Sequence, residues 1–177
     1  MEQKTILDAA QLQLTLRRLA HQIFEQHPNF MNTILIGIQP RGVSMAIRLV
    51  ETIKQEFNIA DVPFGVLDVS YYRDDVHRDS TIKSYTSKID ISLENKNVVL
   101  IDDVLYTGRT VRSALDAMLA YGRPQKVELC VLIDRKFSRH LPVQADYVGK
   151  AIDSHLSQKV KVKWIEQDDK DEILLLN

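Results

Sequence analysis

The chain has 177 residues, of which 45% are hydrophobic and 27% are charged, a balance typical of one compact globular domain. The net charge of −1 provides no overall positive field for nucleic acid, although a local basic face is compatible with it. The single cysteine, Cys130, excludes a disulfide within the chain and lies in an apolar run, where we expect a buried thiol. No signal-peptide pattern and no apolar stretch of ~20 residues is found, which favours a soluble cytoplasmic protein without membrane contact.

The hydrophobic pattern predicts helices and strands in alternation. Apolar residues spaced by three and four positions follow Asp8, which we expect to cap the first helix. Short β-branched runs bounded by turn residues predict buried strands. In chain order, we expect a helix over residues 8–27, a strand over 33–38, a helix over 43–57, strands over 62–72 and 98–101, a helix over 111–121, strands over 127–133 and 147–149, and a terminal hairpin of 160–165 with 173–176.

The segment between residues 73 and 97 differs from the rest because it is polar and contains few large apolar side chains. Long polar connections inside compact domains are usually functional lids or disordered pieces. We therefore expect a flexible lid over residues 73–97, with a plain solvated hairpin as the alternative. Tyr71 and Tyr72, which precede it, are expected in the strand or the core rather than stacked on a base.

The alternation predicts an α/β fold with a mostly parallel central sheet flanked by helices on both faces. In such sheets, ligands bind beyond the carboxyl ends of the strands. Polar clusters follow four of the predicted strands, and we expect these clusters to meet at one edge of the sheet. They are residues 39–42, 73–75, 102–110 and 134–136.

The sequence VVLIDDVLYTGRT, residues 98–110, carries the clearest chemical signal. Carboxylates at the end of a strand can accept hydrogen bonds from sugar hydroxyls. Backbone N–H groups and threonine hydroxyls at a helix N-terminus can bind a phosphate. Each piece alone is common in turns and helix caps, but together they predict a site for a ribose 5-phosphate.

This segment resembles the phosphoribosyl diphosphate (PRPP) binding motif of type I phosphoribosyltransferases. Arg109 stands where many of those enzymes have a second glycine, and the sequence around it, residues 102–110, resembles the PyrR family instead. Members of that family are described as pyrimidine operon regulators with uracil phosphoribosyltransferase activity. Further segments resemble the same family, in order along nearly the whole chain: GIQPRG at 37–42, YRDD at 72–75, GRP at 122–124, VLIDR at 131–135 and ADYVGK at 145–150.

The resemblance implies a type I phosphoribosyltransferase that joins uracil to PRPP, giving UMP and diphosphate. Asp102 and Asp103 would bind the 2′ and 3′ hydroxyls of the ribose and favour an oxocarbenium-like transition state. Arg109 is equally compatible with a phosphate contact and with solvent. The residues implied around the 5′-phosphate are Val104, Leu105, Tyr106, Thr107, Gly108, Arg109 and Thr110.

The resemblance also implies where the diphosphate lies. The turn formed by Pro40, Arg41 and Gly42 would bind it. Arg73 and the lid that follows would close over it and exclude water, because water could hydrolyse the reactive centre.

Asp134 and Arg135 would lie on the side of the base or of the metal–diphosphate. Mg²⁺ is implied, held mainly by PRPP oxygens and water, since the sequence shows no dedicated protein cage. We expect a single domain over residues 1–177, with a core at about 30–150 and a small hood made of N-terminal residues and about 151–177. The resemblance further implies a homodimer or a larger homo-oligomer.

The family's second role implies binding to the leader of pyrimidine operon RNA. His21, Arg139 and Lys150 match polar positions associated with that binding, whereas residues 136–140 differ from the family pattern in length and composition. Basic clusters of this kind bind a phosphate backbone or simply form a solvated surface. Two alternatives to the enzyme therefore stay open: an RNA-binding attenuation regulator with little enzymatic role, and a type I phosphoribosyltransferase for a purine base.

Overall fold

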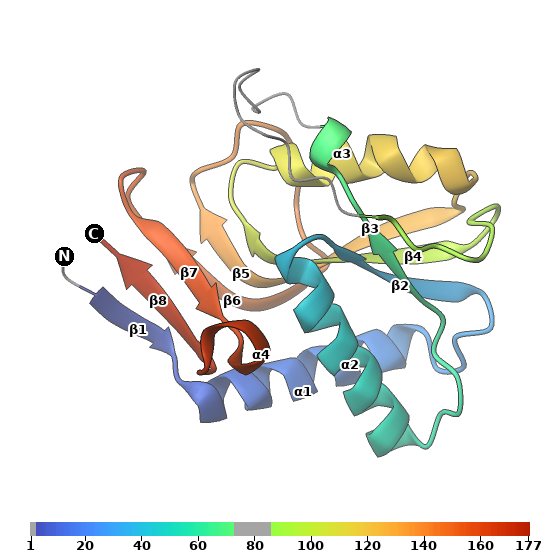
Figure 1. The fold of residues 1–177 in the computed structure, drawn as a ribbon, viewed down its shortest axis with the longest axis horizontal. Coiled ribbons are helices and arrows are strands. Elements are labelled where there is room, and N and C mark those ends of the chain that lie inside the picture. Colours follow the sequence, from blue (N-terminus) through green and yellow to red (C-terminus); the bar gives the residue numbers. More distant parts are fainter. Residues whose placement is uncertain (1–2, 73–85) are drawn as a thin grey trace.

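The computed structural model describes residues 3–72 and 86–177. These residues form a five-stranded parallel sheet and a three-stranded antiparallel sheet (Figure 1). The strands are β1 (Gln3–Leu7), β2 (Thr33–Ile38), β3 (Phe64–Leu67), β4 (Asn97–Leu105), β5 (Lys126–Lys136), β6 (Tyr147–Asp153), β7 (Lys159–Lys163) and β8 (Glu172–Leu176). The helices are α1 (Ala9–Gln26), α2 (Arg41–Phe57), α3 (Arg109–Met118) and α4 (Ile165–Asp168), with short 3₁₀ turns at Ser70–Tyr72 and Leu119–Tyr121.

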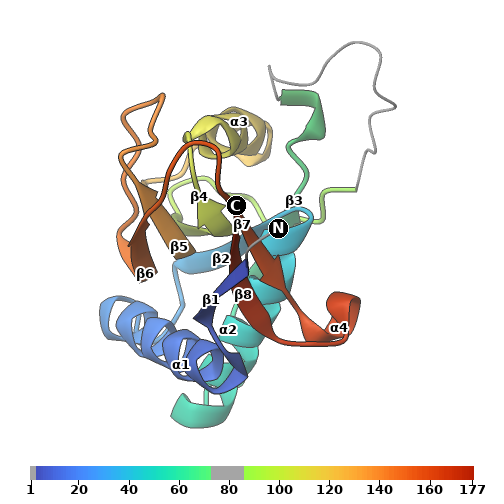
Figure 2. The same cartoon turned by 90° about the vertical axis from the view of Figure 1, so that its left-hand side faces the viewer.

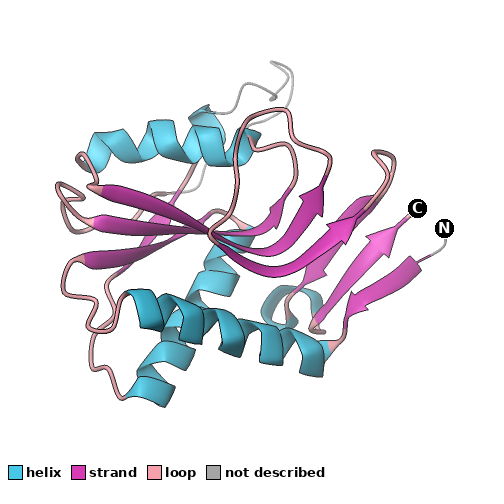
Figure 3. Cartoon of the chain, turned by 180° about the vertical axis from the view of Figure 1, so that it is seen from behind, coloured by secondary structure: helices cyan, strands magenta, loops and turns pink. Residues whose placement is uncertain are grey.

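The large sheet has the strand order β3–β2–β4–β5–β6 and is covered on both faces. Helices α1 and α2 pack on one face and α3 packs on the other, so that the sheet is the middle of three layers (Figure 3). Because both faces are buried, β2 is apolar or β-branched along its whole length rather than alternating. The predicted α/β fold with a parallel sheet between helices is therefore confirmed.

Helix α1 forms as predicted, and its start is explained by a capping box. The backbone N–H of Gln11 donates to the Asp8 carboxylate at 2.8 Å, and the Asp8 N–H donates to the Gln11 side chain at 3.1 Å. The helix ends at His27, which occupies the C-cap position. Its leucines at positions 12, 16 and 19 are buried against the sheet, which confirms the face predicted from their spacing.

A small second sheet forms a hood beside the carboxyl ends of the parallel strands (Figure 2). In this hood β8 is the central strand, paired antiparallel with β1 on one side and with β7 on the other. The terminal hairpin is confirmed. The N-terminal contribution proves to be a full strand, β1, which was not predicted because its sequence is short and half polar.

Several elements of the parallel sheet extend beyond their predicted ends. Strand β4 continues through the two acids, and β5 continues through Lys136. Charged residues suggest a loop by composition, but the ladder between these strands still pairs Leu105 with Asp134. Helices α2 and α3 likewise begin two residues earlier than expected, at Arg41 and Arg109. Strand β6 extends to Asp153 instead of ending at residue 149.

The prediction for residues 62–72 is wrong at both ends. Strand β3 covers only Phe64–Leu67, and a 3₁₀ turn follows at Ser70–Tyr72. The Tyr72 side chain is 44% exposed, so its predicted place in the strand or the core is also wrong. The bond from the Ser113 hydroxyl to the Tyr72 carbonyl, 3.0 Å long, attaches this turn to α3 instead.

The predicted lid divides into two parts. Arg73 and the rest of residues 73–85 lie outside the described residues. Residues 86–97 are anchored, because Lys88 forms an antiparallel bridge with Val66 and Leu93 is fully buried. The prediction of a flexible lid is therefore wrong for residues 86–97, where backbone pairing compensates for a polar composition.

Cys130 is fully buried in β5, and burial raises the pKa of its thiol, so it is an inert core residue as expected. None of the helices in residues 3–72 and 86–177 is long and apolar enough to span a bilayer.

Candidate functional site

Three predicted clusters meet at the carboxyl edge of the parallel sheet. Strand β4 brings the acid pair there, the turn after β2 lies against it, and the end of β5 lies on its other side. A cavity of about 280 Å³ opens at this edge. Its lining includes every residue expected around the 5′-phosphate, which are residues 104–110, together with Asp102 and Val111.

The acid pair stands at the boundary between core and cavity. Asp102 is buried, with 9% exposure, and its carboxylate accepts a hydrogen bond of 2.9 Å from the Asp103 N–H. Burial raises the pKa of Asp103, and nearby Arg41 and the Val104 backbone offset this only in part. The ionised form of Asp103 is therefore only partly stabilised, and a cationic or hydroxyl-bearing ligand would stabilise it further.

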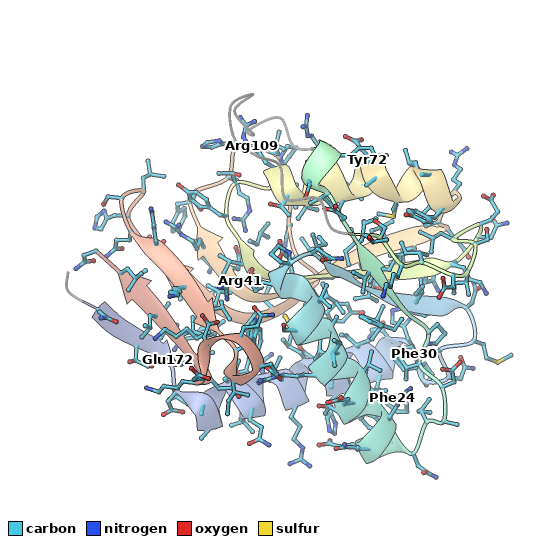
Figure 4. All side chains as sticks on the ribbon, viewed as in Figure 1. Phe24, Phe30, Arg41, Tyr72, Arg109 and Glu172 are labelled. Carbon is cyan, nitrogen blue, oxygen red and sulfur yellow. The ribbon has the colours of Figure 1, made fainter. Side chains whose placement is uncertain are left out.

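Gly42 explains how Arg41 comes close to these acids. A Cβ at this position would lie 2.4 Å from the Ile101 carbonyl oxygen and 3.1 Å from the Asp102 Cα. Only glycine therefore permits the first turn of α2 to pack directly on β4. This close approach places the Arg41 guanidinium near Asp103 and at the start of α2 (Figure 4).

The loop between β4 and α3, residues 106–108, is shaped to receive an anion and is called the phosphate loop below. Gly108 has a φ of +90° and is the N-cap residue of α3, where it offers no side chain as a cap. Thr107 stands at the same end, and its hydroxyl accepts a long bond of 3.4 Å from the Arg109 N–H. The positive end of α3 faces the cavity, and no carboxylate of the described residues caps it. This arrangement favours phosphate binding.

Arg109 is the first residue of α3 and is partly buried where it lines the cavity (Figure 4). This position is compatible with a phosphate contact. Of the two alternatives, a side chain directed only to solvent agrees less well with that partial burial.

Arg139 fills a role that the sequence did not suggest. Its guanidinium donates to the carbonyls of Leu105, Tyr106 at 2.5 Å and Arg135 at 3.0 Å, and it forms an ion pair with Asp134. It therefore supports the phosphate loop from behind, instead of standing on an exposed basic surface. A local pattern could not reveal this, because the Leu105 and Tyr106 carbonyls lie 34 and 33 positions earlier in the chain.

Asp134 and Arg135 lie at the end of β5, beside the phosphate loop. The Arg135 guanidinium stacks over the Tyr106 ring, 4.1 Å from the ring centre. It also donates to the Ser154 hydroxyl at 2.9 Å and to the His155 carbonyl at 3.0 Å. Arg135 thus joins the phosphate loop to the segment that leads into the hood, which is compatible with the expected side of the base.

The Arg41 side chain reaches the hood as well as the acids. Its Nη1 donates to the Val162 carbonyl at 2.6 Å and to the Asp168 carboxylate at 3.3 Å. Neither Val162 nor Asp168 was predicted to belong to the site, since both are far from the other clusters in sequence.

Comparison with known proteins agrees with this geometry. Residues 2–167 match the model of the phosphoribosyl transferase domain. A bifunctional protein PyrR of Enterococcus faecalis is 42% identical over 175 residues, which cover 99% of this chain and 97% of that protein. The PyrR proteins of Actinobacillus pleuropneumoniae and Oceanobacillus iheyensis are 44% and 46% identical, with at least 97% of either chain covered. The chain belongs to the PyrR family.

Solved structures similar to this PyrR family member include enzymes for purine bases. A hypoxanthine phosphoribosyltransferase of Staphylococcus aureus has a TM-score of 0.71 at 22% identity, with 98% of this chain and 92% of that chain covered. A hypoxanthine phosphoribosyl transferase of Trypanosoma cruzi has a TM-score of 0.74 at 18% identity, with 98% and 91% covered. At such identities these similarities establish the shared fold alone.

The residues expected to bind RNA in a PyrR protein do not form one exposed cluster of free cations. His21 on α1 is 46% exposed and lies 2.5 Å from Glu56, which also pairs with Arg17 at 2.7 Å. The Lys150 ammonium on β6 donates to the Ile6 carbonyl at 3.0 Å. His21 and Lys150 remain compatible with RNA contact, whereas the described contacts of Arg139 assign it to the phosphate loop.

Proposed function

We propose that this chain is a uracil phosphoribosyltransferase, which converts uracil and PRPP to UMP and diphosphate. The observation that carries this proposal is the junction of three groups at one edge of the sheet. Asp102 of β4 and the N-terminal end of α3 line one cavity, and Arg41 at the start of α2 lies near Asp103, the neighbour of Asp102. Together they match the ribose, the diphosphate and the 5′-phosphate of PRPP, in a chain of the PyrR family.

The reaction joins uracil N1 to C1′ of PRPP while the bond from C1′ to the diphosphate oxygen breaks. The diphosphate leaves with the electron pair, and the N1 proton of uracil passes to solvent. Asp102 and Asp103 would hold the ribose hydroxyls and place negative charge near a ring that becomes oxocarbenium-like. Arg41 would stabilise the charge that develops on the departing diphosphate.

The phosphate loop anchors the other end of the substrate. The N-terminal N–H groups of α3 and the hydroxyls of Thr107 and Thr110 would bind the 5′-phosphate. Arg139 would keep this loop in one conformation, since its guanidinium joins the loop carbonyls to Asp134. A fixed anchor orients C1′ toward the base and lowers the entropic cost of the reaction.

Mg²⁺ fits the electrostatics of the acid pair. Burial raises the pKa of Asp103 despite the nearby Arg41, so an added cation would be stabilised here. Among the described residues no three His, Cys, Asp or Glu side chains gather closely enough to bind a metal. The ion would therefore enter with PRPP, held by its oxygens and by water, and would neutralise the diphosphate charge.

The test is a comparison of bases. The purified protein is incubated with PRPP, Mg²⁺ and uracil, hypoxanthine or guanine, and nucleotide formation is measured. Nucleotide formation with uracil and not with the two purine bases supports the proposal. Reaction with a purine base and not with uracil would instead support the alternative of a purine phosphoribosyltransferase.

RNA regulation is a second proposed function, favoured by membership of the PyrR family. His21 on α1 and Lys150 on β6 are its candidate contacts, because α1 lies against β6 through the 2.5 Å bond from Arg18 to the Gly149 carbonyl. Binding to a pyrimidine operon leader, measured against salt concentration with and without UMP, tests this role. A salt dependence no steeper than that for unrelated RNA would argue against specific recognition.

Glu56 gives that test a sharper form. It already pairs with both Arg17 and His21, so it competes with any phosphate for these groups. We expect Glu56→Gln to strengthen leader binding and Lys150→Gln to weaken it, with Lys54→Gln on α2 as the control. The lid with Arg73 and the expected homo-oligomer remain predictions.

A further inference from the structure

The contacts between the hood and the start of α2 carry an inference that rests on the proposed function. The turn of α4 lies beside α2 (Figure 1), and long side chains join α2 to this turn and to strand β7. Three polar side chains of α2, one or two helical turns apart, bind this part of the hood. Arg41 binds Val162 and Asp168, Ser44 binds Gln167 at 3.0 Å, and Arg48 binds Glu166 and Asp171 at 2.8 Å.

Arg41 differs from Arg48, whose three guanidinium nitrogens all donate to the hood, because only one nitrogen of Arg41 is used. Both hood contacts are made by Nη1, at 2.6 Å to Val162 and 3.3 Å to Asp168. Within the described residues, Nε and Nη2 have no hydrogen-bond partner. A guanidinium held in this way keeps a pair of parallel N–H groups that match two oxygens of a phosphate.

Asp168 is itself firmly placed, so it can hold another group. Its carboxylate accepts a bond of 3.2 Å from the Trp164 N–H, and Trp164 is fully buried. Burial acts to raise the pKa of Asp168, but the Trp164 N–H and the Arg41 guanidinium more than offset this, and the pKa lies below its ordinary value. Asp168 is therefore an anionic and anchored partner for Arg41.

We propose that Asp168 is a positioning residue that holds the Arg41 guanidinium for bidentate binding of the diphosphate of PRPP. Asp168 does not touch the substrate. It acts through Arg41, and it makes the diphosphate end of the site depend on the correct folding of the hood. Long arginine side chains lose much rotamer freedom when they bind, so holding one in advance strengthens binding.

The test measures PRPP and diphosphate binding by calorimetry in the presence of Mg²⁺, together with the KM for PRPP, the KM for uracil and kcat. For Asp168→Ala we expect about tenfold weaker binding of PRPP and diphosphate, as for loss of one charge-assisted contact. The KM for uracil and kcat should change little. Asp168→Asn keeps the acceptor for the Trp164 N–H, and its effect should be intermediate.

Two controls separate positioning from general damage to the hood. Glu166→Gln removes an ion pair from the same turn of α4 without touching Arg41, and it should leave PRPP binding unchanged. In an Arg41→Lys background, Asp168→Ala should have almost no further effect, because the two residues act through one contact.

Unchanged or tighter PRPP binding in Asp168→Ala would overturn the inference, the latter by showing that Asp168 competes with diphosphate. A parallel rise in the KM for uracil would also overturn it, because that outcome indicates a distorted hood. A wild-type protein that binds PRPP but makes no UMP contradicts the proposed enzyme and leaves the Asp168 test intact. A wild-type protein that binds neither PRPP nor diphosphate overturns both.

Discussion

Asp103 and Glu128 are acidic side chains on neighbouring strands of one sheet, and their surroundings are opposite. Glu128, at the amino end of β5, is 5% exposed and is bound by Lys126 at 2.7 Å and by His27 at 2.6 Å. Burial acts to raise its pKa, yet these partners more than offset that effect and the pKa is lowered. Asp103, at the carboxyl end of β4, has too little compensation, and its pKa is raised.

The two environments indicate different roles: Glu128 stabilises the fold, whereas Asp103 is suited to bind a ligand. Glu128 links the end of α1 to β5 because it bonds to His27. His27 also bonds to Thr33 at 3.0 Å, which adds β2 to the same network. Asp103 is kept at a cost in stability because the charge that would balance it comes with the substrate. Substitutions at the two positions should therefore have opposite effects on stability and activity.

The largest expected effect is the loss of activity in Asp103→Asn. We expect UMP formation to fall about 100-fold or more, because the ionised group would no longer stabilise the transition state. The melting temperature should stay the same or rise, because a partly buried and poorly balanced charge is removed. Enzyme assays and calorimetry measure the two quantities.

Asp116→Asn is the control for that substitution, since Asp116 is exposed on α3. It should change neither activity nor melting temperature. If Asp103→Asn retained activity or unfolded the protein, Asp103 would be a structural acid like Glu128, and the contrast between them would be lost.

The second effect is the loss of stability in Glu128→Gln. Breaking a buried, hydrogen-bonded ion pair costs about 3 kcal/mol of unfolding free energy, measured by denaturant titration. Activity below the melting transition should be retained, because Glu128 lies at the opposite end of the strand from the site. Glu51→Gln, on the exposed side of α2, should be neutral, and a stable but inactive Glu128→Gln would contradict the contrast.

The third effect is expected in Gly42→Ala, which alters the surroundings of Asp103 without touching its charge. The added methyl group would lie 2.4 Å from the Ile101 carbonyl oxygen, so α2 must move away from β4. We expect a loss of about 1–3 kcal/mol in stability and weaker PRPP binding, measured by calorimetry. Gly65→Ala is the matched control, because the closest neighbour of its methyl group would be the flexible Ile89 side chain at 3.1 Å, while the nearest backbone atom, the Lys88 carbonyl oxygen, would lie at 3.4 Å.

The smallest effect is the pH dependence of stability, which should differ in sign between the two acids. The pKa of Glu128 is below its ordinary value of 4.5, so its contribution to stability is present above pH 4.5 and is lost as the pH falls. The pKa of Asp103 is above its ordinary value of 3.8, so its contribution becomes less favourable as the pH rises through that range. Urea unfolding of the wild type and both variants between about pH 3 and 6 measures these slopes. Slopes of equal sign would show that the two acids have similar surroundings.

Much of the fold could be predicted because its signals are local. The capping box at Asp8 and the apolar run of β2 depend only on neighbouring residues, and the acids that follow a buried strand already indicated the ribose site. The roles of Arg139 and Asp168 could not be predicted in this way. Arg139 depends on backbone carbonyls, and Asp168 on a guanidinium, that only the folded chain brings near. In the sequence, a basic residue in a polar loop has the same pattern whether it faces solvent or supports another loop. The ends of β4 and β5 were missed for a related reason, since their charged residues still pair in the ladder.

The pairing of β1 with β8 has a consequence for how the hood assembles. Gln3 lies opposite Leu176, so the hood cannot form until the two ends of the chain have met. A circular permutant, with a short linker between those ends and new termini opened between the exposed residues Ala60 and Asp61, would turn this distant pairing into a local hairpin. Local contacts form faster than distant ones, so the permutant should complete its hood, and with it the environment of Arg41, earlier in refolding than the natural chain, as stopped-flow measurements would show.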